Sequence, residues 1–220
     1  MLSFRLAVAA IALAAVAPAT ASPITTLYST GVDNAGIATT GNGVDLHWGL
    51  LPEAGAYTGG ANGVFPIGPW LAETATSRWL TPSSNAAQSY DPVSDGIYTY
   101  TTTFDLTGFK TASAALRGRF ASDNTVDSIT LNGVTITGSG GSFTSWNNFS
   151  SAGGTFVAGV NRLTFTVRNF ASGSGNPTGL RVEVAGTAGA IPEAATWTMM
   201  VAGFGMIGFA ARRRVRTIAA

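Results

Sequence analysis

The sequence of 220 residues contains no cysteine and a single histidine, His47. Without cysteine there is no disulfide, no thiol nucleophile and no thiolate metal site. This absence does not argue against folding, because a chain of this length buries a core without covalent staples. His47 lies beside Trp48 in an expected strand, and we interpret it as a structural rather than a catalytic residue.

Charged residues are also scarce. They make up 10% of the chain, against about 25% in an average soluble domain. From Ser22 to Ala190 there are seven basic and ten acidic side chains, which leaves this part with a net charge of −3. Affinity for nucleic acid comes largely from basic side chains that neutralise phosphates, so we expect no nucleic-acid partner.

Sequence signatures of catalysis are missing as well. The chain has no Gly-x-Ser-x-Gly elbow, no His-Glu-x-x-His and no phosphate-cradling loop. Glycosidases need two facing carboxylates, and the spacing of Glu53, Glu73 and Glu183 does not pair any two of them. We therefore predict that the protein is not an enzyme.

The first 21 residues have the features of a secretory signal peptide. Arg5 supplies a short positive region, residues 6–16 form an apolar run, and Ala19 and Ala21 form an A-x-A cleavage pattern. The run is too short to cross about 30 Å of hydrocarbon comfortably. We predict export through the Sec translocon and cleavage after Ala21.

A second hydrophobic segment lies near the end of the chain. Residues 194–211 carry no charge, and Arg212, Arg213, Arg214 and Arg216 follow at once. About 18 uncharged residues is the lower limit for a membrane-spanning helix, and arginines just beyond it act as a cytoplasmic stop. We expect a transmembrane helix that holds the precursor in the inner membrane by a single span.

Residues 191–216 carry a more specific pattern. The run Ile-Pro-Glu-Ala-Ala-Thr-Trp-Thr-Met-Met at residues 191–200, with the apolar helix and the arginines after it, closely resembles the PEP-CTERM sorting signal in its proteobacterial form P-E-P-x-x-W-x-M-M. The matching residues are Pro192, Glu193, Trp197, Met199, Met200, Arg212, Arg213 and Arg214. Ala194 stands where the motif has its second proline, so tail removal is expected to be slow or absent if the processing enzyme needs that proline.

This resemblance implies a Gram-negative host with an exopolysaccharide system. It also implies an exosortase in the membrane that recognises the tail, removes it and passes the body toward the outer surface. The mature protein is then expected at the cell surface or in the extracellular biofilm matrix. The alternative interpretation of the same segment is an ordinary tail anchor without sorting.

The segment between the two ends, residues 23–188, has no long helical periodicity. Its strongest local signal is Asn132-Gly133 between two alternating runs, because both residues accept the positive φ of a type I′ turn. This predicts a hairpin in which Leu131 lies opposite Val134 and Ile129 opposite Ile136 on one face, with Thr130 and Thr135 on the other.

Alternation of apolar and polar residues recurs along this segment. The predicted core faces are Tyr98, Tyr100, Thr102, Phe104 and Leu106; Leu116, Gly118 and Phe120; Leu163, Phe165 and Val167; and Leu180, Val182 and Val184. Half-buried strands separated by Gly, Ser and Asn turns predict an all-β fold, a β-sandwich domain over residues 23–188. Residues 138–142 and 171–175 are predicted loops.

The order of motifs in this domain resembles a family too. The motifs are Asp45 to Trp48, Ser77 to Leu80, Gly96 to Leu106, Phe120 to Asn124, Leu131 to Gly133, Gly159 to Asn169 and Asn176 to Leu180. This order resembles the galactose-binding-domain-like jelly roll, which is common in carbohydrate-binding modules and sugar-processing enzymes. The resemblance implies the fold and leaves the ligand open, because this scaffold hosts many functions.

Two groups of residues in the domain are candidate binding sites. Asp123, Asn124 and Asp127 cluster before the hairpin, and oxygen ligands in loops suit a structural Ca²⁺; the competing interpretation is turn chemistry. Trp146, Asn147 and Asn148, with Trp70 near two proline turns, combine an aromatic platform with amides for sugar hydroxyls. The competing interpretation places Trp146 in the core, since aromatic side chains dominate cores.

From the sequence we therefore expect a non-catalytic, exosortase-sorted surface protein that associates with exopolysaccharide. The alternative is a structural or adhesive surface protein that binds other proteins and recognises no sugar.

Overall fold

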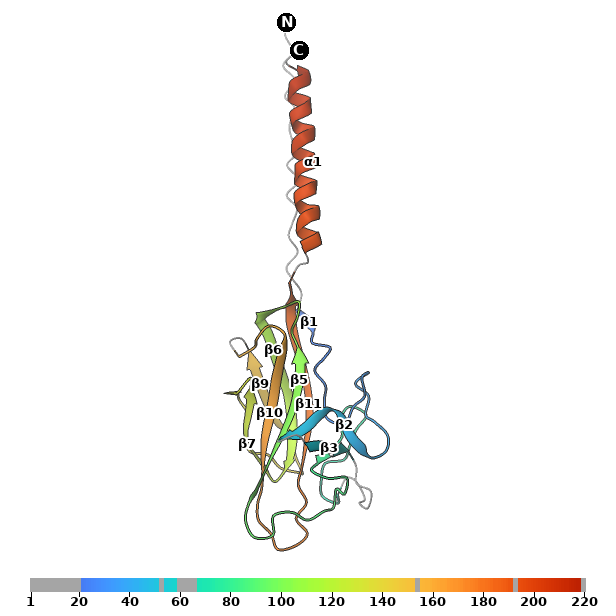
Figure 1. The fold of residues 1–220 in the computed structure, drawn as a ribbon, viewed down its shortest axis with the longest axis vertical. Coiled ribbons are helices and arrows are strands. Elements are labelled where there is room, and N and C mark those ends of the chain that lie inside the picture. Colours follow the sequence, from blue (N-terminus) through green and yellow to red (C-terminus); the bar gives the residue numbers. More distant parts are fainter. Residues whose placement is uncertain (1–20, 52–53, 59–66, 153–154, 192–193, 219–220) are drawn as a thin grey trace.

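The computed structural model describes residues 21–51, 54–58, 67–152, 155–191 and 194–218. In these residues the chain forms a strand-rich body and a single helix (Figure 1). The strands are β1 (Ala21–Pro23), β2 (Gly43–Leu51), β3 (Ala54–Thr58), β4 (Leu80–Thr81), β5 (Gly96–Asp105), β6 (Phe109–Asp123), β7 (Thr125–Leu131), β8 (Val134–Thr135), β9 (Asn147–Ala152), β10 (Val160–Asn169) and β11 (Gly179–Ala190), and the helix is α1 (Ala194–Ile218). The all-β body predicted from the sequence is confirmed.

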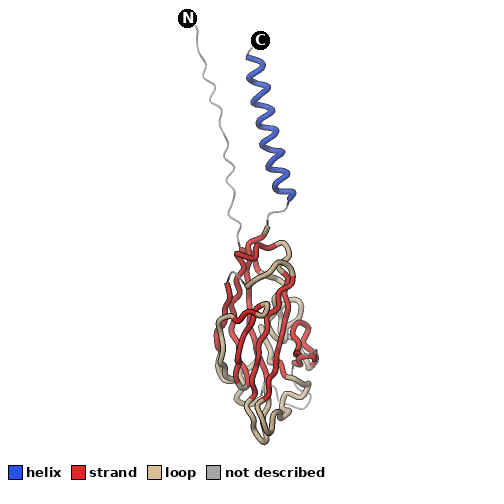
Figure 2. Tube along the Cα trace, turned by 60° about the vertical axis from the view of Figure 1, so that its left-hand side comes forward, coloured by secondary structure: helices blue, strands red, loops and turns tan. Residues whose placement is uncertain are grey.

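The strands form one curled sheet with two facing parts. Its order is β8, β7, β10, β5, β2, β3, β4, β11, β6, β9, and β1 pairs with β11 at the side. The strands β7, β10 and β5 form one layer and β11, β6 and β9 the other, while β2, β3 and β4 connect the layers (Figures 1 and 2). The two layers meet where Phe165 of β10 contacts Phe149 of β9, with ring centroids 5.1 Å apart, and Phe120 of β6, at 5.8 Å. The body is therefore sandwich-like.

Alternation along the long strands decides which side chains fill the space between the layers. Leu163, Phe165 and Val167 of β10 are fully buried, and so are Tyr100 and Leu106 on the predicted face of β5 and its continuation. Successive side chains of a strand point to opposite faces, so this burial matches the period-2 pattern of the sequence. The predicted core faces of β5, β6 and β10 are confirmed.

The predicted hairpin is confirmed in turn type and register. Asn132 and Gly133 have φ values of 53° and 81°, the positive values that a type I′ turn requires. Leu131 pairs with Val134 and Thr130 with Thr135, and the Ile136 amide donates to the Ile129 carbonyl. Leu131 is fully buried, whereas its partner Val134 is 53% exposed.

A long connection between β3 and β4 covers the outside of β11. Its described part, residues 67–79, contains Trp70 and Trp79, whose rings lie with centroids 4.3 Å apart at a tilt of 39° and form a second cluster with Ala121. The residues that pack against this cluster are Ile67, Leu71, Phe143 and Trp146. We call residues 67–79 the strap.

The chain enters and leaves the body at the same end. Ala21 of β1 pairs with Gly189 of β11, and the Ile191 amide donates to the Gly108 carbonyl at that end. Helix α1 projects from there, as both views of the backbone show (Figures 1 and 2). Residues 1–20, which hold Ala19 and most of the predicted signal peptide, lie outside the described residues.

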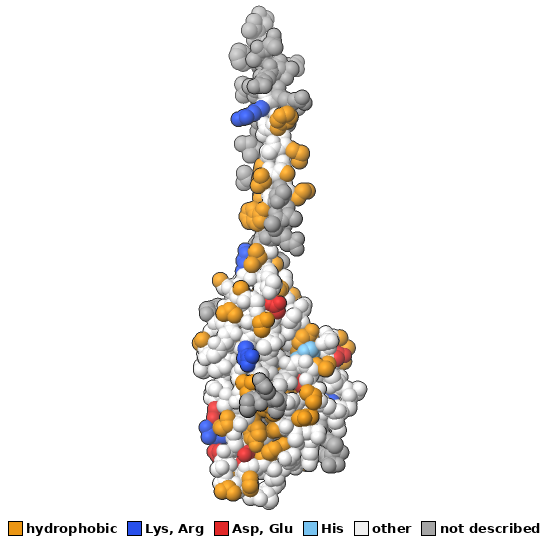
Figure 3. Space-filling model, in the orientation of Figure 1, with side chains coloured by type: hydrophobic (Ala, Val, Ile, Leu, Met, Phe, Trp, Pro, Cys, Tyr) orange, Lys and Arg blue, Asp and Glu red, His pale blue; other side chains and the backbone are white. Residues whose placement is uncertain are grey.

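Helix α1 covers most of the predicted sorting segment. Trp197, Met199 and Phe209 are 57%, 76% and 64% exposed on it, and apolar side chains follow its length in Figure 3. Across the described part of the chain, no helix combines the length and apolar character that crossing a bilayer requires. The predicted helix is thus present, and its passage through a membrane is not confirmed.

Candidate functional site

A groove that contains several polar and charged side chains lies on the outer face of the layer formed by β9, β6 and β11. Its volume is about 790 Å³. Two cross-strand rows form its floor: Asn148, Arg119 and Glu183 in one, and Ser150, Arg117 and Ala185 in the next. These side chains point outward because their sequence neighbours Leu116, Phe120 and Phe149 point into the core. The lining residues are Ser29, Thr76, Arg117, Gly118, Arg119, Thr137, Asn148, Phe149, Ser150, Glu183, Val184 and Ala185.

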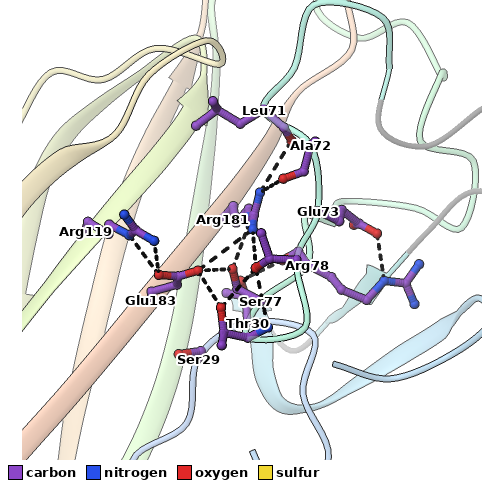
Figure 4. Close-up of polar contacts among 12 residues, drawn as sticks. Ser29, Thr30, Leu71, Ala72, Glu73, Ser77, Arg78, Arg119, Arg181 and Glu183 are labelled. Atoms are coloured by element: carbon purple, nitrogen blue, oxygen red, sulfur yellow. Dashed lines mark hydrogen bonds and ion pairs between the residues drawn. The ribbon is translucent and has the colours of Figure 1, made fainter. Parts of the chain in front are cut away.

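Glu183 is the single carboxylate of this lining, and the protein satisfies it fully. Its Oε1 accepts from the hydroxyls of Thr76 and Ser77 at 2.8 and 2.9 Å, and its Oε2 accepts from Arg119 Nε and Nη2 at 2.8 and 2.7 Å (Figure 4). Burial alone raises the pKa of Glu183, but the hydrogen bonds from Thr76, Arg119 and Ser77 outweigh it and leave the pKa lowered. The carboxylate is therefore held ionised, which does not suit a general acid.

Arg181 lies behind Glu183 and is fully buried. Its guanidinium donates to Ser77 Oγ at 2.8 Å, to Thr74 Oγ1 at 2.9 Å and to the Leu71 and Ala72 carbonyls, so it ties the strap to β11 (Figure 4). Burial lowers the pKa of Arg181, and the nearby Glu183 and Glu73 oppose that effect. Sequence alternation gave no sign of this role, since it places Arg181 on the solvent face of β11.

The strap has its own ion pair. Arg78 Nε donates to Glu73 Oε2 at 2.9 Å, while Glu73 Oε1 accepts from the Trp79 amide at 2.9 Å. Arg78 Nη1 also donates to the Thr39 carbonyl at 3.0 Å. The strap thereby presents Thr76 and Ser77 to Glu183 in a defined position, and the side of the groove at β11 is built by tertiary contacts.

Trp146 lies next to the groove and is half-buried. The guanidinium carbons of Arg119 and Arg181 lie 4.5 and 4.8 Å from its ring centroid, and the ring packs against the Trp70 and Trp79 cluster. A cation over the face of an aromatic ring is attracted to the ring's electrons. The ring thus helps to position Arg119, and its predicted role as a sugar platform stays a prediction.

The structure separates the other predicted ligand residues. Asn148 is exposed in the groove, whereas Asn147, its neighbour on β9, points to the opposite face of the strand and is half-buried. Trp70 is only 6% exposed, and its Nε1 donates to Asp123 Oδ2 at 2.9 Å. Ligand binding by Trp70 stays a prediction that this burial does not favour.

The three candidate calcium ligands have protein partners. Asp123 Oδ1 accepts from Asn124 Nδ2 at 2.8 Å, and Asn124 Oδ1 accepts from the Phe170 amide at 2.7 Å. Asp127, by contrast, forms an ion pair with Arg168 at 2.6 Å. Within the described ranges, no group of three or more His, Asp or Glu side chains is placed to hold a metal ion. A structural Ca²⁺ stays a prediction.

His47 lies outside the groove. Its ring stacks on Tyr28 with centroids 3.7 Å apart and the planes 7° from parallel. Its Nε2 is buried and has no hydrogen-bond partner among the described residues. This stacking is consistent with the structural role that we expected, although the unpaired nitrogen was not expected.

The protein thus consists of a strand-rich, sandwich-like body, which carries the groove on its outer face, and a C-terminal helix. The particular tail is shown by comparison: residues 190–214 match the PEP-CTERM protein-sorting motif, so the resemblance drawn from the sequence is confirmed. Trp197, Met199 and Arg212 of the motif are exposed on α1, and Pro192 and Glu193 lie outside the described residues. The motif implies an exported, membrane-anchored precursor that an exosortase sorts.

The chain is also similar in structure to the Family 11 Carbohydrate-Binding Module of the cellulosomal cellulase Lic26A-Cel5E of Clostridium thermocellum. The identity is 13% and the TM-score 0.35, over 71% of this chain and 99% of that chain. No curated protein matches the chain.

Proposed function

We propose that the chain is the precursor of a non-catalytic cell-surface protein. Its body binds exopolysaccharide in the groove on the outer face of β9, β6 and β11. The observation that carries this proposal is the pair of cross-strand rows on β9, β6 and β11, which align an amide, a hydroxyl and two guanidinium groups. These groups donate and accept the hydrogen bonds that sugar hydroxyls need.

The groove is organised before any ligand arrives. Glu183 and Trp146 hold Arg119 from two sides, and Thr137 donates to the Ser150 carbonyl at 2.6 Å. Groups that are already ordered lose less conformational entropy on binding, so a larger share of the contact energy remains as affinity. This rigidity supports a binding role for the groove. We assign the body to the galactose-binding-like jelly rolls as part of the same proposal.

The binding proposal predicts that Asn148→Ala lowers retention of the full chain on the host's exopolysaccharide about two- to tenfold, because one lost hydrogen bond between neutral groups costs about 0.5–1.5 kcal/mol. Asn148 is exposed, so the melting temperature should stay unchanged. Asn34→Ala is the matched control, since Asn34 is an exposed asparagine outside the groove lining. Unchanged retention of Asn148→Ala would contradict the proposal. If the protein binds no glycan on a glycan array, an adhesive role toward other proteins is favoured instead.

The sorting proposal predicts a mature protein that begins at Ser22 and lacks helix α1. Mass spectrometry of the native protein measures both ends directly. Ala194→Pro restores the second proline of the motif, and the processed fraction should then rise. If the wild type and the Ala194→Pro variant both still end at Ala220, the tail is a permanent anchor.

A further inference from the structure

We propose that the ligand of the groove is an acidic polysaccharide, whose carboxylates bind Arg117. This inference rests on the proposed function and adds the charge of the glycan. It begins from a difference among the arginines of the body. Arg78, Arg119, Arg168 and Arg181 each pair with an Asp or Glu within 4.0 Å. In the described residues, no carboxylate forms an ion pair with Arg117.

Arg117 occupies the second row of the groove floor. It lies between Ser150 of β9 and Ala185 of β11, and it is exposed. Arg119 is two residues further along the same face of β6, which places the two Cα atoms about 7 Å apart. The groove therefore contains one guanidinium that is already paired and one that is available.

The charge balance of the groove follows from this arrangement. Among its lining residues, Arg117 and Arg119 are positive and Glu183 is negative, so the net charge is +1. Glu183 is fully engaged by Arg119, Thr76 and Ser77 and does not turn toward Arg117. The body as a whole, residues 22–190, has a net charge of −3, so the groove is a local positive site on an acidic body.

A neutral glycan in this groove would displace water from Arg117 without supplying a counter-charge. Removing water from an unpaired charge is costly. The carboxylate of a uronic acid matches the planar fork of the guanidinium and forms two charge-assisted hydrogen bonds with it. The exposed side-chain amide of Asn148 then remains for the hydroxyls of the same sugar and its neighbours.

The test measures binding of the full chain in detergent to polygalacturonate, to alginate and to carboxyl-reduced polygalacturonate. The reduced polymer keeps the linkage and the length and loses only the charge. The wild-type chain should bind at least one of the two polyuronates about tenfold or more tightly than the reduced polymer, and the difference should shrink at high salt. Arg117→Gln should remove the difference, and Arg117→Lys should restore part of it, because lysine keeps the charge and loses the fork.

Arg162→Gln is the matched control, since Arg162 is an exposed arginine on β10 in the other layer, and it should behave as the wild type. Equal binding of charged and reduced polymers, or polyuronate binding that Arg117→Gln leaves unchanged, would overturn the acidic specificity and leave the binding proposal intact. If the chain binds neither polyuronate but is retained on a neutral exopolysaccharide, the acidic specificity is likewise overturned and the binding proposal stands. Failure to bind any polysaccharide would remove both proposals.

Discussion

Replacing Arg181 with leucine should lower the free energy of unfolding by about 3–5 kcal/mol, because the buried guanidinium joins several polar groups that have few other partners. Without it, the Ala72 carbonyl loses a donor, Thr74 and Ser77 each lose a hydrogen bond, and Glu183 loses a cation 3.9 Å away. Each buried polar group left unsatisfied costs about 1–3 kcal/mol. Urea unfolding of the full chain measures the change.

The same substitution should loosen the strap. Arg181 is the side chain of β11 that holds Leu71 and Ala72, so its loss should speed limited proteolysis within residues 67–79. Arg162→Leu provides the control, because an exposed arginine without an ion pair among the described residues should change stability by less than about 0.5 kcal/mol. A cost below about 1 kcal/mol for Arg181→Leu would show that the other contacts of the strap hold it in place without Arg181.

Asp123→Asn should remove a fall in stability of about 2–3 kcal/mol that the wild type shows between pH 4 and pH 7. Burial raises the pKa of Asp123 from its ordinary value of 3.8 to about 6, against the opposing hydrogen bond from Trp70. The folded chain therefore keeps this proton at pH values where the unfolded chain has released it. The penalty is absent below about pH 4, grows as the pH rises, and is complete above about pH 6.

The measurement is the difference between the two unfolding curves across this pH range, in the presence of a chelator so that no cation compensates the carboxylate. Burial also raises the pKa of Asp45, but that contribution is common to both proteins and cancels. Asp127→Asn is the control, since Asp127 pairs with Arg168 on the surface and should show less than about 1 kcal/mol of change. A flat difference for Asp123→Asn would mean that Asp123 ionises in the folded state without cost.

Much of the body was predictable because its signals are local. The hairpin depends on two adjacent residues, Asn132 and Gly133, that accept positive φ, and its register follows from the turn type. The buried faces of β5 and β10 depend on period-2 alternation, which any sandwich-like body preserves. The sorting motif is likewise continuous in sequence, so its match at residues 190–214 needed no knowledge of the fold.

The candidate site was predictable only in part. The sequence named Asn148 as a candidate ligand, but its companions in the groove come from β6 and β11, about 30 and 35 residues away along the chain. Trp146 and Trp70 have the residue type expected of a sugar platform, yet Trp70 is a buried residue of the strap and Trp146 packs against its cluster. Residue type alone does not separate a platform from a core side chain, because both need a large apolar ring.

The sequence by itself determined the strand-rich body, the hairpin, the inward faces of the long strands and the sorting tail, since each depends on residues within a few positions of one another. Tertiary structure alone decided the groove and the burial of Arg181. Alternation places Arg181 on the outer face of β11. The strap, which is part of the β3–β4 connection, covers that face and buries Arg181. The physical reason is that the burial of a side chain on an outer face depends on which other segment packs over it. The sequence of the strand alone does not indicate that segment.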